Sequence, residues 1–99
     1  MSIIARVGDL LDRSKFPPGV VFVARGAALP TDVDTVVVDL GMAGALDAVR
    51  ELRAAGFAGR VVGYGRHTER ELLADAAAAG CDAVLPRSTF FADVAGALG

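Results

Sequence analysis

The most regular feature of the chain is a set of short apolar runs that do not alternate with polar residues. Three of them are rich in β-branched residues and span 20–23, 35–38 and 61–62. A strand with one solvent-exposed face alternates apolar and polar residues, so these uninterrupted runs predict strands buried on both faces, as in a parallel sheet. Weaker runs at 3–7 and 83–85 are candidates for a first and a last strand.

Helical periodicity fills the segments between the later strands. In the first of these, Leu46, Val49 and Leu52 recur at helical spacing, and Gly56 follows as a C-terminal cap. The segment between the strands at 35–38 and 61–62 is therefore predicted to be an amphipathic helix.

Two further helices are predicted after residue 67. Thr68 and Glu71 have the spacing of a capping box, and the alanine-rich segment that follows them ends at Gly80. A last helix is expected to begin with Ser88 as its N-cap. The residues of its apolar stripe are Phe90 or Phe91, Val94 and Leu98.

Strand and helix alternate from Thr35 onward, which predicts βαβ units in a doubly wound parallel α/β sheet of four to five strands. The first third is less regular. Residues 9–16 allow about two helical turns before Pro17, and 26–34 leave little room for a helix. We therefore expect a shortened first helix and a vestigial second helix. The 99 residues are enough for a single domain, 1–99.

Composition narrows the function classes. The chain is 54% hydrophobic and 22% charged, and its net charge of −2 does not favour binding to nucleic acid. No apolar run is long enough to span a membrane. Cys81 is the only cysteine and His67 the only histidine. The chain therefore lacks the set of spaced Cys and His ligands that a zinc site needs, and its sequence indicates no catalytic pair of a nucleophile and a histidine. We expect a cytoplasmic protein that is not an enzyme and carries no cofactor.

Any site is expected at the carboxyl ends of the strands, where doubly wound sheets bind their ligands. The segments that reach this edge are 6–9, 39–44, 64–67 and 86–88.

Two of these segments resemble response-regulator receiver domains, which have a flavodoxin-like fold. Residues 34–44 are similar to the third strand and following loop of that family, with Asp39 at the phospho-accepting position. Residues 80–87 are similar to the segment that ends in a lysine, with Arg87 in its place. The resemblance implies a signalling domain whose acceptor aspartate binds Mg²⁺ together with an acidic pair at the end of the first strand.

The acidic pair is altered in this chain. One alignment places Arg6 and Val7 at its positions, and an arginine there would repel the metal and pair with Asp39. A two-residue slip would instead place Gly8 and Asp9 there, so that Asp9 and Asp39 could bind Mg²⁺. The sequence leaves both registers open.

Other functional positions also depart from the resembled family. Gly65 occupies the position where that family has Ser or Thr. Arg87 replaces the lysine with a side chain of different reach and geometry. The pocket is therefore expected to contain Arg6, Asp9, Gly65, Arg66 and Arg87 around an inactive acceptor. We expect the Asp39 carboxylate to be held by Arg6, by Arg87 or by backbone N–H groups of the loop.

The resemblance also implies a contact surface for a protein partner or a second copy, formed by the fourth helix, fifth strand and fifth helix. Its candidate residues are Arg70, Arg87, Phe90 and Phe91. Because the two phenylalanines are adjacent, only one of them can point fully into the core.

Three functions follow from these observations. The favoured one is a non-catalytic pseudo-receiver that binds a protein partner and is not phosphorylated. The alternative is a phosphorylatable response regulator with Asp39 as acceptor and Mg²⁺ as cofactor. The second alternative is a flavodoxin-like domain that binds a small ligand across 41–44 and 63–65.

Overall fold

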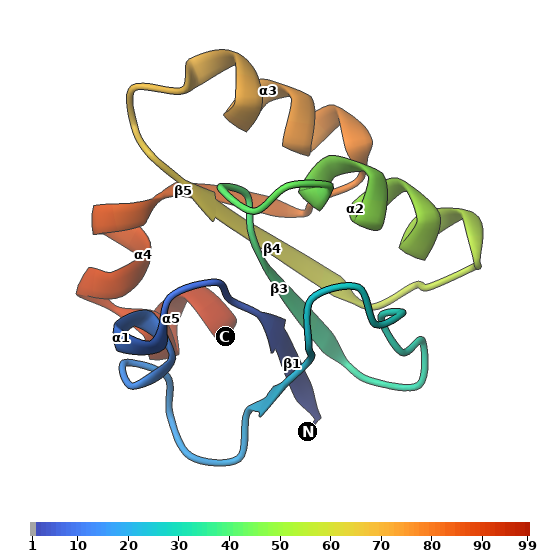
Figure 1. Ribbon diagram of the computed structural model, residues 1–99, viewed down its shortest axis with the longest axis horizontal. Helices are drawn as coiled ribbons and strands as arrows, with labels where there is room; N and C mark the ends of the chain where they lie inside the picture. Colours follow the sequence, from blue (N-terminus) through green and yellow to red (C-terminus); the bar gives the residue numbers. More distant parts are fainter. Residues whose placement is uncertain (1) are drawn as a thin grey trace.

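The computed structural model describes residues 2–99 and contains a five-stranded parallel sheet in the order β2-β1-β3-β4-β5 (Figure 1). This is the flavodoxin-like order, in which the strand sequence reverses beside β1, so the predicted fold class is confirmed. The strands are β1 (Ile3–Arg6), β2 (Val21–Phe22), β3 (Thr35–Asp39), β4 (Arg60–Gly65) and β5 (Ala83–Pro86). The helices are α1 (Leu10–Arg13), α2 (Ala45–Ala54), α3 (Arg70–Ala79), α4 (Arg87–Ala92) and α5 (Val94–Leu98).

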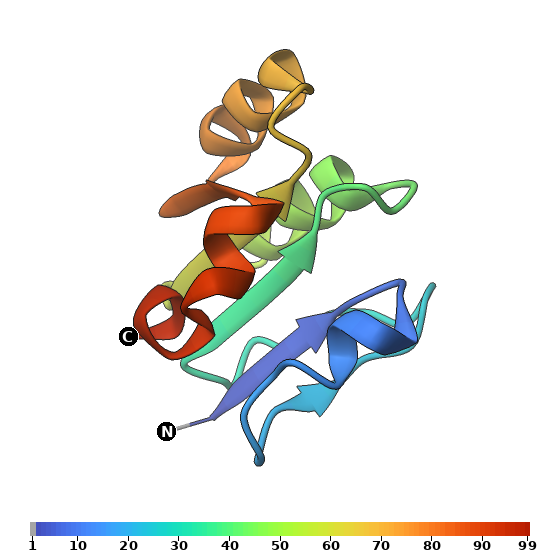
Figure 2. The same cartoon turned by 90° about the vertical axis from the view of Figure 1, so that its left-hand side faces the viewer.

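The sheet lies between two layers of helices. Helices α2 and α3 cover one face, and α1, α4 and α5 lie on the other (Figures 1 and 2). Val36 and Val38 pack in the α2 layer, whereas Val37 packs in the α4 layer, and all three are fully buried. The apolar runs are therefore buried on both faces, as their lack of alternation predicts.

The amino-terminal third is short of helix. Helix α1 has four residues, about one turn instead of the expected two, and Asp9 caps it by accepting a hydrogen bond from the Leu11 N–H at 2.7 Å. Residues 23–34 connect β2 to β3 without a helix, in agreement with the expected vestigial second helix.

The predicted start of α3 is wrong. The helix begins at Arg70 with Glu69 as its N-cap, and no side chain caps it. Thr68 lies in the preceding turn, where the Glu69 N–H donates to the Arg66 carbonyl at 3.0 Å, so the capping box does not form. The end is correct, since Gly80 follows the last residue with a φ of 129°.

The predicted last helix is divided into two. Ser88 is not an N-cap, because α4 begins directly after β5 at Arg87. Asp93 then leaves the helical conformation, and its side chain accepts from the Gly96 N–H at 3.0 Å and caps α5. The apolar stripe survives this break: Phe90, Val94 and Leu98 are buried in one cluster. Among residues 2–99, no helix has the length and apolar character to cross a bilayer.

Candidate functional site

A cavity of about 620 Å³ opens at the carboxyl ends of the strands. It is formed by the loops after β1, β3 and β4 together with the start of α4. Of the predicted pocket residues, four line it beside Asp39, and one does not. Those that line it are Asp9, Gly65, Arg66 and Arg87, and the exception is Arg6.

The Asp39 carboxylate at the end of β3 is held by backbone amides. Its Oδ1 accepts from the Gly41 N–H at 2.9 Å and its Oδ2 from the Gly8 N–H at 3.3 Å. The sequence suggested three partners for this carboxylate: Arg6, Arg87 and backbone N–H groups. The structure has the backbone N–H groups in that role. The expectation that Arg6 pairs with Asp39 is wrong.

The course of β1 explains where Arg6 goes. Successive side chains of a strand point to opposite faces, so Arg6 shares the α2 face with Ile4. Its guanidinium donates to the Ala27 carbonyl, in a different cavity. Gly8 and Asp9 reach the Asp39 pocket instead, which is the slipped register.

A buried carboxylate of the pocket, Asp12, forms an ion pair with Arg87. The Asp12 side chain is 0% exposed, and both of its oxygens accept from the two terminal nitrogens of Arg87. The Nζ of Lys15 lies 3.8 Å from the same carboxylate. The hydrogen bonds that Arg87 donates to Asp12 raise the pKa of Arg87, so the guanidinium stays charged.

Sequence reasoning missed Asp12. In this segment Leu10 and Leu11 are 76% and 73% exposed, while the charged Asp12 is buried. A one-turn helix gives no periodicity from which its inner face can be read. The partner, Arg87, is distant in the chain, so no local spacing indicates the pair.

Aromatic rings form the floor beneath this ion pair. Tyr64 is fully buried and stacks on Phe90 with 4.7 Å between ring centroids, while Phe91 meets it edge-on at 5.0 Å. The Arg87 guanidinium lies 5.1 Å from the Phe91 centroid, and the Lys15 ammonium lies 4.9 Å from it on a cation–π contact. Phe90 is thus a core residue and not an interface residue, and Phe91 is only partly buried.

The Tyr64 hydroxyl lies under the charged groups without a partner of its own. It is buried and makes no hydrogen bond with any part of the chain that the structure describes. Burial, followed by the nearby charges of Asp39 and Asp12, strongly raises the pKa of the phenol. The floor of the pocket therefore contains a neutral phenol at ordinary pH.

Two other candidates do not line the cavity: His67 is exposed in a turn, and Arg70 is exposed at the start of α3. Arg66 lines the cavity and is exposed. Cys81 is half-buried at the other end of the sheet, and burial raises the pKa of its thiol to about 11, so it remains a protonated thiol.

The carboxylates of the pocket are largely engaged. Asp12 is neutralised by Arg87, one oxygen of Asp9 caps α1, and both oxygens of Asp39 accept N–H groups. Glu69 lies at the rim beside Arg66. Within residues 2–99, no three side chains of His, Cys, Asp or Glu are grouped so as to hold a metal ion.

A comparison with solved structures agrees with this fold. The crystal structure of a two-component response regulator of the LuxR family from Aurantimonas sp. SI85-9A1 is similar to 95% of this chain and 78% of that chain, with a TM-score of 0.67 and 20% sequence identity. The chain has a receiver-like fold. No protein-family model and no curated protein sequence matches it.

The receiver-like fold gives each pocket residue a position to compare with the resembled family. Asp39 ends β3 and Arg87 directly follows β5, which are the places where the sequence resemblance predicts the acceptor and the lysine. Gly8 lies beside Asp39, and Gly65 ends β4 without a hydroxyl. The Asp39 carboxylate at the end of β3 is thus flanked by two glycines, which have no side chain.

Proposed function

We propose that this receiver-like domain acts as a non-catalytic interaction module that binds a protein partner or a second copy of itself and is not phosphorylated. The observation that carries the proposal is the bidentate pair of Arg87 with buried Asp12. Both terminal nitrogens of Arg87 are engaged there, so the cation at the lysine position is not free to neutralise a phosphoryl group on Asp39.

The glycines around Asp39 support the same proposal. Transfer of a phosphoryl group to a carboxylate requires a divalent cation held by several oxygen ligands. Gly8 contributes only an N–H to Asp39, and Gly65 offers no hydroxyl to a phosphoryl oxygen. Asp9 is the remaining carboxylate on this side, and its Oδ1 is used by the Leu11 N–H.

The partner surface would be the α3–β5–α4 face, which corresponds to the fourth helix, fifth strand and fifth helix of the resembled family. Arg70 is exposed there, and Phe91 is partly exposed beneath Arg87. An aromatic ring flanked by arginine is a composition that protein interfaces favour.

Metal binding and phosphoryl transfer can be tested by NMR of the ¹⁵N-labelled protein. Mn²⁺ broadens amide signals near a bound site, and Mg²⁺ with acetyl phosphate reports acceptor activity. We expect neither treatment to change the amides of Gly8, Gly41 and Arg66 selectively. Selective broadening at Gly8 and Gly41, or a phosphodonor-dependent shift, would contradict the proposal.

A Gly8→Asp variant is the matched positive control. A Cβ at Gly8 would lie 3.6 Å from Asp39 Oδ2 and 3.2 Å from the Met42 Cγ, which can shift, and the backbone there needs no glycine conformation. The new carboxylate would face Asp39, so we expect Mn²⁺ broadening of the Gly41 amide in this variant alone.

A phosphorylatable regulator is the second candidate, because Asp9 and Asp39 do line one cavity. It requires a Mg²⁺-dependent acyl phosphate in the unmodified protein. Such a phosphate, lost in Asp39→Asn and retained in Arg70→Gln, would establish it.

A further inference from the structure

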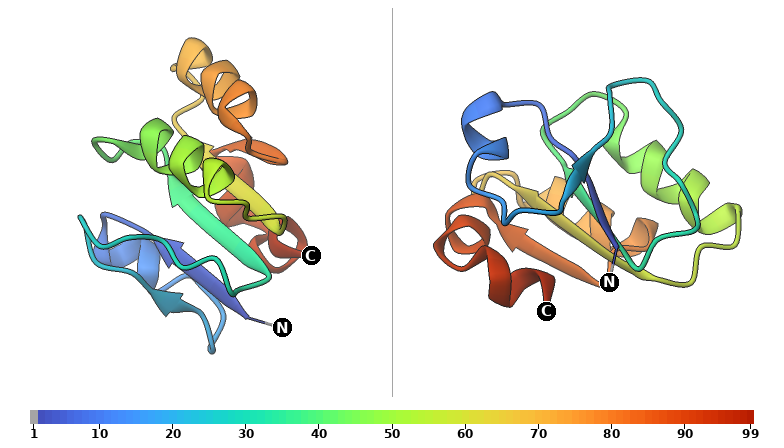
Figure 3. Two further views of the ribbon diagram at one scale, coloured as in Figure 1. Left: turned by 90° about the vertical axis from the view of Figure 1, so that its right-hand side faces the viewer. Right: turned by 90° about the horizontal axis from the view of Figure 1, so that it is seen from below.

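One part of the sheet lacks the helix that a doubly wound fold places on it. Helices α2 and α3 lie over β3, β4 and β5, whereas residues 23–34 cross from β2 to β3 as a loop without a helix (Figure 3). Val23, Leu29 and Val33 of this segment pack against the core. They cover β1 but leave a groove between the segment and α2.

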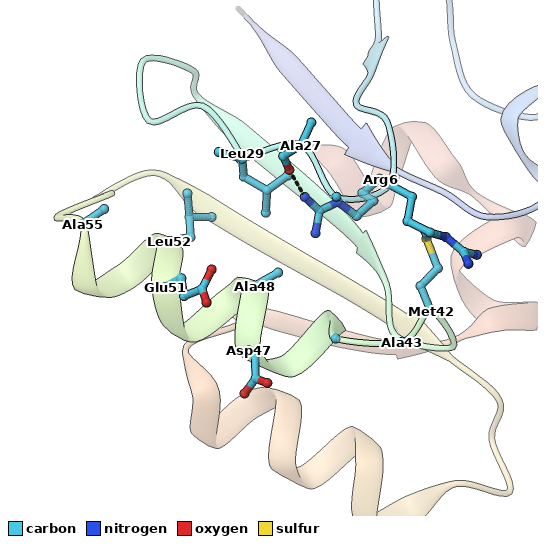
Figure 4. Close-up of a pocket in the computed structure, with 14 residues that line it drawn as sticks. Arg6, Ala27, Leu29, Met42, Ala43, Asp47, Ala48, Glu51, Leu52 and Ala55 are labelled. Atoms are coloured by element: carbon cyan, nitrogen blue, oxygen red, sulfur yellow. Dashed lines mark hydrogen bonds between the residues drawn. The ribbon is translucent and has the colours of Figure 1, made fainter.

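The groove has a volume of about 630 Å³ and an apolar floor. Ala48, Leu52 and Ala55 line it from α2, and Ala27 and Leu29 line it from the opposite side (Figure 4). The α2 residues are small or buried, so an occupant can approach the helix closely.

The two walls carry opposite charges. Arg6 and Arg25 stand on the wall next to β1, and Asp47 and Glu51 stand on α2. The Nε of Arg6 is buried and has no partner in residues 2–99, although its terminal nitrogen donates to Ala27. That nitrogen is out of reach of a docked partner, but the positive charges of Arg6 and Arg25 on this wall favour an acidic one.

The other charged side chains of the groove can pair with a bound partner at little cost in free energy. Arg25 and Glu51 are exposed and form no side-chain hydrogen bond or ion pair with residues 2–99. Asp47 pairs with Arg50 at 3.1 Å, but both side chains are more than half exposed. An exposed pair of this kind is worth less than about 1 kcal/mol and is readily exchanged.

We propose that this groove binds an amphipathic helix of a partner protein. The helix carries a stripe of small and apolar residues, acidic residues along the edge that faces Arg6 and Arg25, and basic residues along the edge that faces Asp47 and Glu51. The α2 wall from Asp47 to Ala55 is about 12 Å long at 1.5 Å per residue, which matches two to three helical turns. The occupant would supply the layer that residues 23–34 do not form.

This proposal does not rest on the function proposed for the Asp39 pocket. The two cavities share Arg25, Met42 and Ala43, but neither Asp39 nor Arg87 lines the groove. A metal or phosphodonor result at Asp39 therefore leaves the groove proposal unchanged.

Three synthetic helical peptides with one Ala/Leu stripe test it. The first, called the two-sign peptide, has Glu along one edge of the helix and Lys along the other. The second has Glu on both edges, and the third has Lys on both. Each is titrated into ¹⁵N-labelled protein. We expect saturable shifts at Ala27, Leu29 and Ala48, with the two-sign peptide binding about ten-fold more tightly than either control, because each control places like charges on one wall.

Substitutions distinguish the groove from other surfaces. Arg25→Glu should weaken the two-sign peptide about ten-fold, and Ala55→Trp should block it, since both residues are exposed and line the groove. Arg70→Glu, on α3 outside the groove, should leave the affinity unchanged. Absence of saturable shifts, equal affinity for all three peptides, or shifts outside the groove would overturn the proposal. Concentration-dependent dimerisation through the same residues without peptide would overturn it in favour of a second copy as the occupant.

Discussion

Asp12 and Arg87 are 75 residues apart in the sequence and form a bidentate ion pair at the base of the pocket, with the carboxylate fully buried. Replacing Arg87 with methionine leaves this carboxylate without its main partner. We expect the free energy of unfolding to fall by roughly 3 kcal/mol, the scale for breaking a buried pair. Urea denaturation followed by circular dichroism measures this loss.

The double variant Asp12→Leu/Arg87→Met is the control for that loss. It removes both charges, so it should recover most of the stability that the single variant loses. Arg66→Met, at an exposed site in the same cavity, should change the free energy of unfolding by less than about 0.5 kcal/mol. A single Arg87→Met variant as stable as the parent would show that the pair contributes nothing.

Tyr64 provides a spectroscopic test of the pocket floor, because it is the only tyrosine and the chain has no tryptophan. Burial raises the pKa of its phenol, so the folded protein should show no phenolate absorbance at 295 nm while an unfolded reference in urea titrates near pH 10. The raised pKa contributes stability at lower pH that is lost as pH rises above the unfolded value. Phenolate should therefore appear together with unfolding, and its appearance in a folded protein near pH 10 would refute the buried position.

The Tyr64 hydroxyl itself should contribute little to stability. It is buried without a hydrogen-bond partner among residues 2–99, which is a desolvation cost with no compensation. Tyr64→Phe keeps the ring that stacks on Phe90 and removes that cost, so we expect a neutral change or a gain of about 1 kcal/mol. A loss above about 1 kcal/mol in thermal or urea unfolding would reveal a partner for the hydroxyl.

Asp82 is expected to stabilise the domain in a way that is lost in acid. It lies at the end of the strands opposite the Asp39 pocket. Its Oδ2 accepts from the Val61 N–H and from Arg53 Nη2, both at 2.8 Å. The backbone hydrogen bond is the main cause that lowers the pKa of Asp82 below its ordinary value of 3.8. A lowered pKa contributes stability above about pH 4 that is lost as pH falls through the folded value.

Asp82→Asn should therefore reduce the difference in urea midpoint between pH 7 and pH 3. Asp75→Asn is the matched control, because this exposed α3 carboxylate accepts no side-chain hydrogen bond within the described chain. An unchanged pH dependence in Asp82→Asn would mean that the carboxylate does not stabilise the fold.

Gly59 is required by close packing. A Cβ there would lie 2.4 Å from the Phe57 Cζ and 2.5 Å from the Asp34 carbonyl oxygen, and the latter is backbone that cannot turn aside. Gly59→Ala should destabilise the domain by roughly 1–3 kcal/mol, the range for overpacking. Ala58→Ser, at the exposed neighbouring position, should leave the thermal midpoint unchanged.

Much of the fold could be read from local patterns. The valine runs identify β3 and β4 because central strands must be apolar on both faces. Gly80 marks the end of α3 because the chain needs a positive φ there. Local patterns predict the starts of helices less well. The Thr68 capping box does not form, because Thr68 lies in the turn that follows β4.

Local residue patterns are enough to predict the alternating strands and helices, and with them the position of Asp39 at the carboxyl edge of a parallel sheet. The residues that surround Asp39 depend on how distant segments pack together, which no local pattern indicates. Whether Arg6 or Gly8 faces Asp39 depends on the register in which β1 lies against β3, and the local pattern of residues 3–9 is compatible with more than one register. The pairing of Asp12 with Arg87 depends on how α1 and α4 dock on the same face, because two charges so far apart in the chain meet only when the sheet brings their loops together.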